Sequence, residues 1–485
     1  MTHHFSWLDY TIFGVYLVAT TVVGLMAGGK GKTLSDYFLA GRGVNRYVVA
    51  MTVLASLFSG ISYIATPAEM YLNGIGFSFV LLSFFIATPF TAVFLMPFFY
   101  NARYFTAYHF FQDRFGLSVR LLASGLFILR VSLWLGGAIF APALAIGAVT
   151  GLPLPFTILS TGLISTLYTM KGGMKAVIWT DVMQLGVLFG GQFLIMLVAA
   201  GMVDGGFAGA WDTAKAAGKL DLNFSLDPQA RITVWAALIG GTFLNLVQMA
   251  TDQVSVQRYL TAGSLRDAQR ALWIKLWMFV PVFLIFLGTG FVLHAFYQQH
   301  GDPIAAGLIQ RADQILPYFV ITQLPSGLPG LLVAAIFAAS MSTVSAGVNS
   351  LTSATLCDFY QTLEKDKVPE AVQVRRARWW TLIYGVLVTM FAFVISQFQT
   401  NLVESINVIM GVIGGPMLGL FLLGMFTKKA DQRGAIIGCV VGLASSLYFY
   451  FHVSFLWITM FSAIVTMITG HVTSGRFAKP SVPHQ

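Results

Sequence analysis

Six polar side chains interrupt an otherwise apolar stretch in the last third of the chain. The segment Phe337–Ser350 carries Ser340, Ser342, Thr343, Ser345, Asn349 and Ser350. Ser342 and Ser345 are three residues apart and therefore share one face of a helix. Hydroxyl and free carbonyl oxygens can bind a sodium ion without adding a net charge. The alternative is that these hydroxyls bond to the preceding helical turn or to a neighbouring helix.

One carboxylate, Asp181, falls about two turns into another apolar stretch, residues 176–201. Placing a carboxylate inside a membrane costs about 2.5–3.5 kcal/mol on insertion scales, so such a residue is a functional candidate by default. The alternative is that Asp181 stays near the membrane surface, where it is solvated or paired with Lys175.

Two apolar stretches contain features that interrupt helices. Residues 46–72 include Gly60, Pro67 and many small residues, and residues 232–257 include a glycine pair and several polar side chains. Interrupted helices at matching positions of two halves indicate the binding site of an inverted-repeat transporter. Close helix packing through glycine is the alternative explanation.

The elements that position these residues are membrane helices. The chain of 485 residues is 57% hydrophobic and 10% charged, with a mean hydropathy of +0.77, whereas soluble domains carry about 25% charged residues. The continuous apolar runs exclude a membrane β-barrel, which needs short alternating segments. We therefore predict an all-α polytopic membrane protein, a single transmembrane domain over 1–485 with about 13 spans of roughly 20 residues or more. The expected spans are 8–28, 46–72, 75–103, 117–148, 154–170, 176–201, 232–257, 268–297, 327–356, 377–397, 401–426, 433–451 and 455–473.

The net charge of +9 reports topology rather than a nucleic-acid partner. With the N-terminus outside, the inward-facing segments and tail hold 22 of the 28 Lys and Arg, and the outward-facing segments hold four. The other two, Arg130 and Lys275, fall within predicted spans. This asymmetry follows the positive-inside rule and predicts a cytoplasmic C-terminus in a cytoplasmic membrane. Residues 1–5 lack the features of a signal peptide, so we expect the first span to be retained.

The chain lacks the motifs of an enzyme. It has no G-x-S-x-G elbow with a neighbouring base, no phosphate-binding G-x-x-x-x-G-K-[ST] and no Cys/His metal spacing. Transport driven by an ion gradient is the function that remains best supported. A transporter-like sensor and a passive channel are the alternatives from other classes.

Four motifs, in order along almost the whole chain, resemble the sodium/solute symporter family. They are Ser35–Gly43, Tyr168–Asp181, Asp252–Arg258 and the polar stretch Phe337–Ser350. The resemblance implies a five-plus-five inverted-repeat core of the LeuT type. The first repeat would span 46–201 and the second 232–426, with one span (8–28) before them and two (433–473) after.

The resemblance also implies sodium sites. The family's principal site, transferred residue by residue, falls on carbonyl and hydroxyl oxygens of Ala55, Phe58, Ala339, Ser342 and Thr343. Some members hold a second sodium through an aspartate and two hydroxyls. Asp181 and Ser345 match two of those positions, but the last is Ala346, which puts a two-sodium stoichiometry in doubt. The coupling ion is sodium in either case.

Substrate class follows less directly from the resemblance. Sugar-transporting members use an Asn, a His and an aromatic residue at positions that are Leu57, Ser62 and Gln248 here, which argues against glucose or galactose. Segments 65–74 and 140–151 resemble the monocarboxylate, multivitamin and iodide branch, whose substrates are anions.

A small organic anion, monocarboxylate-like, is therefore the expected substrate. The N-termini of broken helices favour a carboxylate, and the expected substrate contacts are Ser56, Ser59, Ser62, Gln248 and Asn407. Arg130 could attract an anion, but pairing or snorkelling is the favoured role for an arginine within a span. A neutral or zwitterionic solute such as a sugar, sialic acid or an amino acid is the alternative.

Overall fold

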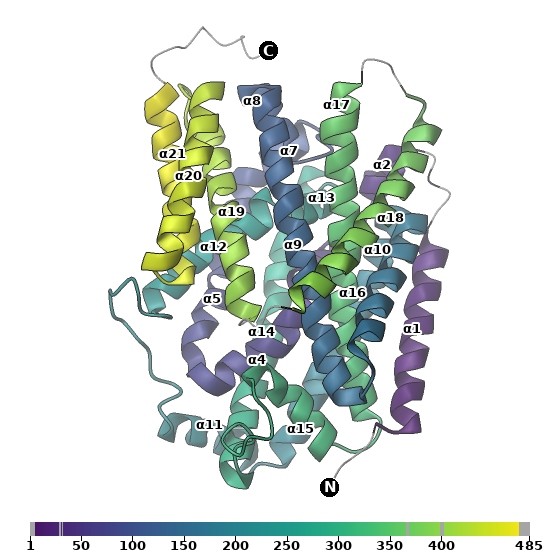
Figure 1. Cartoon of the computed structure of the whole chain (residues 1–485), viewed down its shortest axis with the longest axis vertical. Helices are drawn as coiled ribbons and strands as arrows, with labels where there is room; N and C mark the ends of the chain where they lie inside the picture. The colour runs from purple at the N-terminus through teal and green to yellow at the C-terminus, as the bar shows by residue number, and fades with distance from the viewer. Residues whose placement is uncertain (1–4, 29–30, 32, 365–367, 398–401, 475–485) are drawn as a thin grey trace.

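A computed structural model gives the fold of the chain. It describes residues 5–28, 31, 33–364, 368–397 and 402–474, of which 148–149 and 402–407 are described by their backbone alone. Within this part the structure is helical and contains no named strand. The long helices run roughly parallel to one another (Figure 1). Helix α1 begins at one end of the bundle and α21 ends at the other, as an odd number of membrane crossings requires.

The first half of the chain contains the long helices α9 and α10 and several shorter ones. In order they are α1 (Trp7–Ala27), α2 (Leu34–Leu39), η1 (Ala40–Arg42), α3 (Arg46–Leu57), α4 (Gly60–Asn73), η2 (Gly74–Phe77), α5 (Ser78–Leu82), α6 (Phe84–Phe90), η3 (Thr91–Leu95), α7 (Met96–Asn101), α8 (His109–Phe115), α9 (Leu117–Thr150), α10 (Leu154–Gly201) and α11 (Gly206–Ala216).

The second half begins with a helix that changes its pitch twice. The elements are η4 (Ala236–Gly240), α12 (Gly241–Leu246), η5 (Val247–Thr251), α13 (Gln253–Tyr259), α14 (Leu265–His300), η6 (Ala312–Gln314), α15 (Ile315–Gln323), α16 (Leu328–Ala354), η7 (Thr355–Tyr360), α17 (Gln361–Leu363), α18 (Glu370–Ile395), α19 (Leu402–Phe426), α20 (Gln432–His452) and α21 (Phe455–Ser474).

Ten helical stretches in the described part are long and apolar enough to cross a membrane. Two of them, 60–101 and 154–201, exceed one crossing and each contains a sharp turn at a glycine with positive φ. Gly74 (φ 73°) separates α4 from α5, and Gly173 (φ 59°) divides α10. Left-handed backbone of this kind favours glycine because it has no Cβ. Divided at these turns, the ten stretches give twelve crossings, and the shorter apolar helix Ala236–Thr251 would supply the thirteenth.

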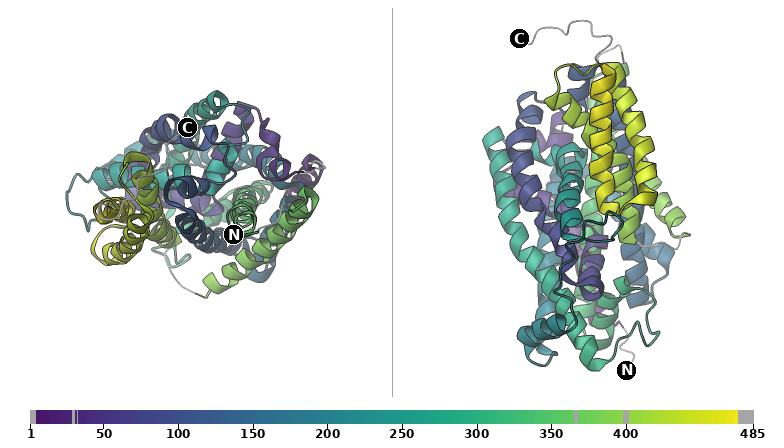
Figure 2. Two further views of the ribbon diagram at one scale, coloured as in Figure 1. Left: turned by 90° about the horizontal axis from the view of Figure 1, so that it is seen from above. Right: turned by 90° about the vertical axis from the view of Figure 1, so that its left-hand side faces the viewer.

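The helix α16, which carries the polar stretch, lies at the centre of the molecule. Nearly every residue of α16 is buried, and the helix packs against α1, α9 and α10. At the edge of the bundle, α20 and α21 pack on α19 as a peripheral pair (Figure 2). The polar residues of α16 are therefore inside the protein and do not face lipid.

Both predicted interruptions exist, but the second lies elsewhere than its glycine pair suggests. The predicted span 46–72 breaks between α3 and α4, at Phe58 and Ser59. The predicted span 232–257 stays helical through Gly240 and Gly241. It breaks at Asp252, which has extended backbone. The two glycines instead permit close packing. A Cβ on Gly240 would lie 2.4 Å from the carbonyl oxygen of Leu456, and one on Gly241 would lie 3.0 Å from Ser83 Oγ.

Candidate functional site

The break between α3 and α4 exposes backbone oxygen atoms in the middle of a span. Phe58 (φ −104°, ψ 104°) and Ser59 (φ −83°, ψ 165°) are both extended, so the Phe58 carbonyl belongs to neither helix. Ser59 Oγ accepts a hydrogen bond from the Ser62 amide at 3.3 Å and caps α4. The Ala55 carbonyl, in the last turn of α3, accepts only a long bond of 3.4 Å from the Phe58 amide. Both predicted carbonyl ligands therefore lie where helix bonding is weakest.

This break packs directly on α16 and α9 at Gly60. A Cβ at this position would lie 2.3 Å from Pro142 Cγ and 2.5 Å from Ser340 Oγ. No atoms fit at such distances, and the proline ring on α9 cannot rotate away. The glycine thus allows the broken helix to contact the polar stretch.

Substituting Gly60 tests this contact. We expect Gly60→Ala to lower the stability by about 1–3 kcal/mol, the usual cost of overpacking a filled core. Gly125→Ala on α9 is the matched control, since a Cβ there would meet no neighbouring side chain or helix within 4 Å. Thermal unfolding in detergent compares the two variants, and equal melting temperatures would contradict the packing account.

The two hydroxyls predicted to hold sodium already donate their protons elsewhere. Ser342 Oγ donates to Asp181 Oδ1 at 2.6 Å, and Thr343 Oγ1 donates to the Ala339 carbonyl at 2.9 Å. Both residues are buried. A hydroxyl whose proton is engaged retains two lone pairs as acceptors. The arrangement therefore leaves oxygen lone pairs for a cation.

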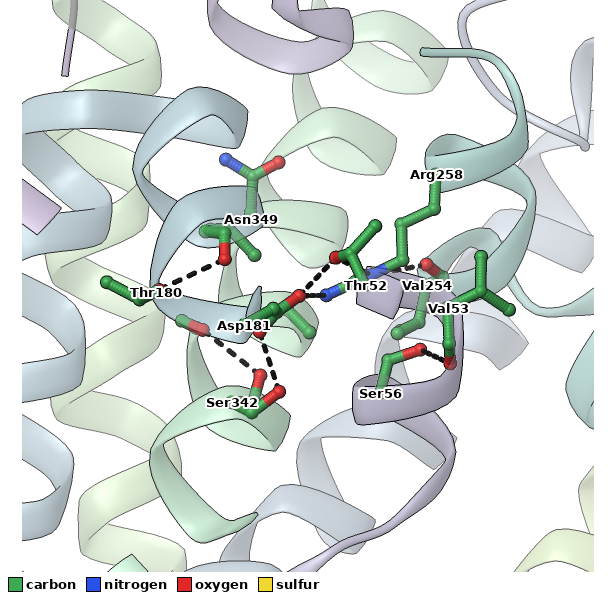
Figure 3. A network of polar contacts seen from close by, with 12 residues as sticks. Thr52, Val53, Ser56, Thr180, Asp181, Val254, Arg258, Ser342 and Asn349 are labelled. Carbon is green, nitrogen blue, oxygen red and sulfur yellow. Dashed lines mark hydrogen bonds and ion pairs between the residues drawn. The ribbon is translucent and has the colours of Figure 1, made fainter. Parts of the chain in front are cut away.

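Asp181 lies deep in the protein rather than at the membrane surface. Its carboxylate has no exposed surface and forms an ion pair with Arg258 on α13 at 3.0 Å. It also accepts from the hydroxyls of Thr52 on α3 and Ser342 on α16 (Figure 3). The interpretation of Asp181 as solvated or paired with Lys175 is wrong, because Arg258, distant in sequence, supplies the positive charge. The network joins α3, α10, α13 and α16.

Ser345 does not reach Asp181. Its hydroxyl donates to the Ser342 carbonyl at 3.0 Å, within its own helix. The neighbouring Ala346 is fully buried and offers no side-chain oxygen. The structure therefore joins Asp181, from the candidate second sodium site, to Ser342 of the principal site rather than to Ser345.

The remaining polar residues of α16 mainly bond to neighbouring helices. Ser340 Oγ donates to the Ala138 carbonyl on α9 at 3.2 Å. Gln257 on α13 bonds to Asn349 Oδ1 at 2.8 Å, and Ser350 Oγ donates to Gln257 Oε1 at 2.9 Å. For Ser340, Asn349 and Ser350 the alternative explanation is correct, because these side chains bond to neighbouring helices.

A cavity of about 150 Å³ lies beside the break, between α4, α6, α9 and η5. It is lined by three of the five predicted substrate contacts, namely Ser59, Ser62 and Gln248. Ser56 is buried outside this lining, where its hydroxyl donates to the Val53 carbonyl at 2.8 Å. The fifth, Asn407, falls outside the side chains that the structure describes. The remaining lining is mostly apolar, which suits a small solute fixed by a few polar groups.

The second break carries a buried ion pair. Asp252 caps α13 by accepting from the Val254 amide at 2.9 Å, and it pairs with Arg130 on α9 at 2.8 Å. The Arg130 side chain is completely buried. The pairing role favoured for this arginine is thus confirmed, and its charge is neutralised by Asp252.

Three further polar residues were not predicted as site residues. Asn245 lines the cavity and donates to Ser83 Oγ at 2.8 Å. Arg258 neutralises Asp181, and Lys275 is fully buried with its amino group over the ring of Phe84, which lines the cavity. The sequence does carry a signal for Lys275, since an ionisable residue within a span is a functional candidate. Arg258 falls at the end of a predicted span, and only the folded chain places it against Asp181.

Comparisons with known proteins point to one family. A sequence model of the sodium:solute symporter family matches residues 37–442. The sodium-dependent multivitamin transporter of Oryctolagus cuniculus is 34% identical over 481 residues, covering 97% of this chain and 73% of the relative. The human (Homo sapiens) sodium-coupled monocarboxylate transporter 1 is 33% identical over 450 residues, or 91% of this chain and 72% of the relative. A solved outward-open, substrate-bound Na⁺-coupled sialic acid symporter superposes with a TM-score of 0.90 at 28% identity, covering 98% of this chain and 99% of the other.

Proposed function

Since the chain belongs to the sodium:solute symporter family, we propose that it imports a small organic anion, monocarboxylate-like, together with sodium by alternating access. Membership establishes the coarser facts: the protein is a multi-pass membrane transporter of the LeuT-type fold, coupled to sodium, and not an enzyme. The substrate, the residues that hold sodium and the orientation in the membrane are our proposals.

The observation that carries the proposal is the packing of the broken helix, at Gly60, on the helix α16, whose Ser342 and Thr343 hydroxyls have already donated their protons. Carbonyls of Ala55 and Phe58 end α3, which α10 and α16 hold in place through the Asp181 network. On α16, the Ala339 carbonyl and the hydroxyls of Ser342 and Thr343 complete the proposed set of five oxygens. All five ligands are hard oxygen atoms without a net charge, which suits a sodium ion. Bound sodium would fix the break relative to α16.

The driving force that the membrane potential adds depends on the net charge carried with the solute. One positive charge that moves inward across 100 mV gains about 2.3 kcal/mol. Because each 1.4 kcal/mol is tenfold in a concentration ratio, this alone sustains roughly fiftyfold accumulation of a solute carried with one net charge. For a monovalent anion carried with one sodium, the transported charge is zero and only the sodium concentration gradient contributes.

An anion fits the side of the cavity formed by α4. Ser59 and Ser62, at the N-terminal end of this helix, line the cavity. A helix N-terminus carries a partial positive charge and favours anions. Relatives named for multivitamin and monocarboxylate transport support the same class. The likeness to a sialic acid symporter favours a second candidate, a larger acidic sugar.

A solute screen tests the proposed substrate. We expect monocarboxylates to raise the melting temperature of the purified protein in sodium and not in potassium. Sialic acid, neutral sugars and amino acids are included in the same screen. Stabilisation by a neutral solute alone would contradict the anion proposal, and stabilisation of equal size in potassium would contradict sodium coupling.

We expect one sodium per transport cycle. The carboxylate of Asp181 is already balanced by Arg258, and Ala346 lacks the oxygen that would complete a second site. Sodium activation of uptake should therefore give a Hill coefficient near 1. Ala346→Ser, which adds only one oxygen atom, should raise the coefficient, whereas Ala346→Gly should not. A coefficient near 2 in the unmodified protein would contradict this stoichiometry.

We further propose that α1 begins outside the cell and that the C-terminal end of α21 faces the cytoplasm. The distribution of Lys and Arg supports this orientation. Labelling of a single cysteine introduced at Ser225, which lies in an exposed loop, by an impermeant maleimide on intact cells tests it. Labelling only after the cells are opened would contradict the proposal.

A further inference from the structure

Lys275 is a fully buried lysine in the middle of the bundle. It lies on α14, and its side chain has no exposed surface. Its ammonium group is 3.1 Å from Thr88 Oγ1 and 3.8 Å from Met249 Sδ, and it lies 4.8 Å from the centre of the Phe84 ring. A hydroxyl, a thioether and an aromatic face surround the charge.

This lysine differs from the other buried cations of the described spans. Arg130, Arg258 and Arg120 each pair with a carboxylate, at 2.8, 3.0 and 2.8 Å respectively. No ion pair within the described residues involves Lys275. A buried lysine without a counter-charge is costly to keep protonated, and an ionisable residue inside a membrane span is a functional candidate by default.

Lys275 adjoins residues that line the cavity. Phe84, whose ring face covers the ammonium group, lines the cavity, and so does Gln248, the neighbour of Met249. The lysine itself does not line the cavity, and Phe84 is the lining residue that contacts its amino group. Direct contact between the amino group and a solute in the cavity would require the Phe84 side chain to move aside.

We propose that Lys275 is the specificity-determining cation of the substrate site and selects a carboxylate over an uncharged isostere. This inference rests on the proposed function, since it takes the cavity as the substrate site. An anion in the cavity supplies the counter-charge that the protein lacks, and the low dielectric surroundings strengthen the attraction. An amide of the same shape cannot compensate the charge. The other charged groups close to the cavity, Glu69 with Arg231 and Arg130 with Asp252, are already paired.

Matched pairs of acid and amide test the role of Lys275. The probes are lactate with lactamide and nicotinate with nicotinamide, and binding is measured by stabilisation of the purified full-length protein at fixed sodium concentration. We expect the unmodified protein to bind the carboxylate at least tenfold more tightly than the amide. Lys275→Gln should remove most of this preference, about ten- to a hundredfold for a charged hydrogen bond. Lys275→Arg should keep the preference.

The controls separate this inference from the proposed function. Lys175→Gln, at a partly exposed lysine on α10, should leave the acid-to-amide ratio unchanged. Stabilisation by sodium alone shows that Lys275→Gln is folded with an intact ion site. A Lys275→Gln protein that responds to sodium and keeps the full preference for carboxylates overturns the role of Lys275 and leaves the anion proposal standing. If the unmodified protein prefers the amides or binds neither member of each pair, the anion proposal and this inference both fail.

Discussion

Replacing Thr343 by valine is expected to remove the stabilisation of the protein by sodium. Valine has nearly the shape of threonine, so the fully buried position on α16 stays filled while the hydroxyl oxygen is lost. A contact with a charged group is worth about 1.5–3 kcal/mol, so sodium affinity should fall by about ten- to a hundredfold. At a sodium concentration that saturates the unmodified protein, the difference in melting temperature between sodium and potassium should largely disappear.

Thr343→Ser is the matched control for this experiment. It keeps the oxygen and loses one methyl group, so it should retain the response to sodium despite some loss of stability. Ser342→Ala should also lose sodium-dependent uptake, but that variant deprives Asp181 of a hydrogen bond as well. A full sodium response in Thr343→Val would show that this hydroxyl does not bind the ion.

Replacing Arg130 by methionine is expected to cost about 3–5 kcal/mol of stability. The change leaves the Asp252 carboxylate buried with no counter-charge, and breaking a buried pair from one side has this magnitude. The guanidinium and the carboxylate have at most 4% exposed surface, so water cannot compensate for the loss. Unfolding in mixed micelles of mild detergent and dodecyl sulfate measures the effect.

The double variant Arg130→Met with Asp252→Asn should recover much of the lost stability. Asparagine is uncharged and still accepts the hydrogen bond of the Val254 amide, so the cap of α13 remains. The pair between Arg46 and Asp267 provides a control, because both side chains are about one third exposed. Arg46→Met should cost less than about 1 kcal/mol. A similar loss in Arg46→Met and Arg130→Met would contradict the importance of burial.

Much of the fold could be predicted from the sequence because membrane spans follow from length and hydropathy. The break near Gly60 was predictable in kind, since glycine is unfavourable within a helix. The motifs also identified the family, which the comparisons confirm. The placement of oxygens on α16 near that break followed from the resemblance, and their role in binding sodium stays a prediction.

The partners of the buried charges could not be predicted, because they depend on tertiary contacts. Asp181 meets an arginine 77 residues away, and Asp252 meets Arg130 across 122 residues. The glycine pair at 240–241 indicated a break at the wrong place for a related reason. Glycine in a membrane helix marks either a break or a close contact, and only the neighbouring helix decides which. The same limit hid Lys275, whose missing counter-charge is visible only once the surrounding residues are in place.

The motif Asp252–Arg258 also receives a physical explanation from the structure. Its polar side chains bind α13 to α9 through Arg130, to α10 through Asp181, and to α16 through Asn349. These contacts hold the short helix beyond the second break.

Binding of radioactive ²²Na⁺ to the purified protein tests the central proposal most directly, because it requires no knowledge of the solute. We predict saturable binding of about one sodium per chain, displaced by unlabelled sodium and not by potassium, lost in Thr343→Val and kept in Thr343→Ser. Equal displacement by potassium, or binding that Thr343→Val leaves unchanged, would contradict the proposed site between the broken helix and α16.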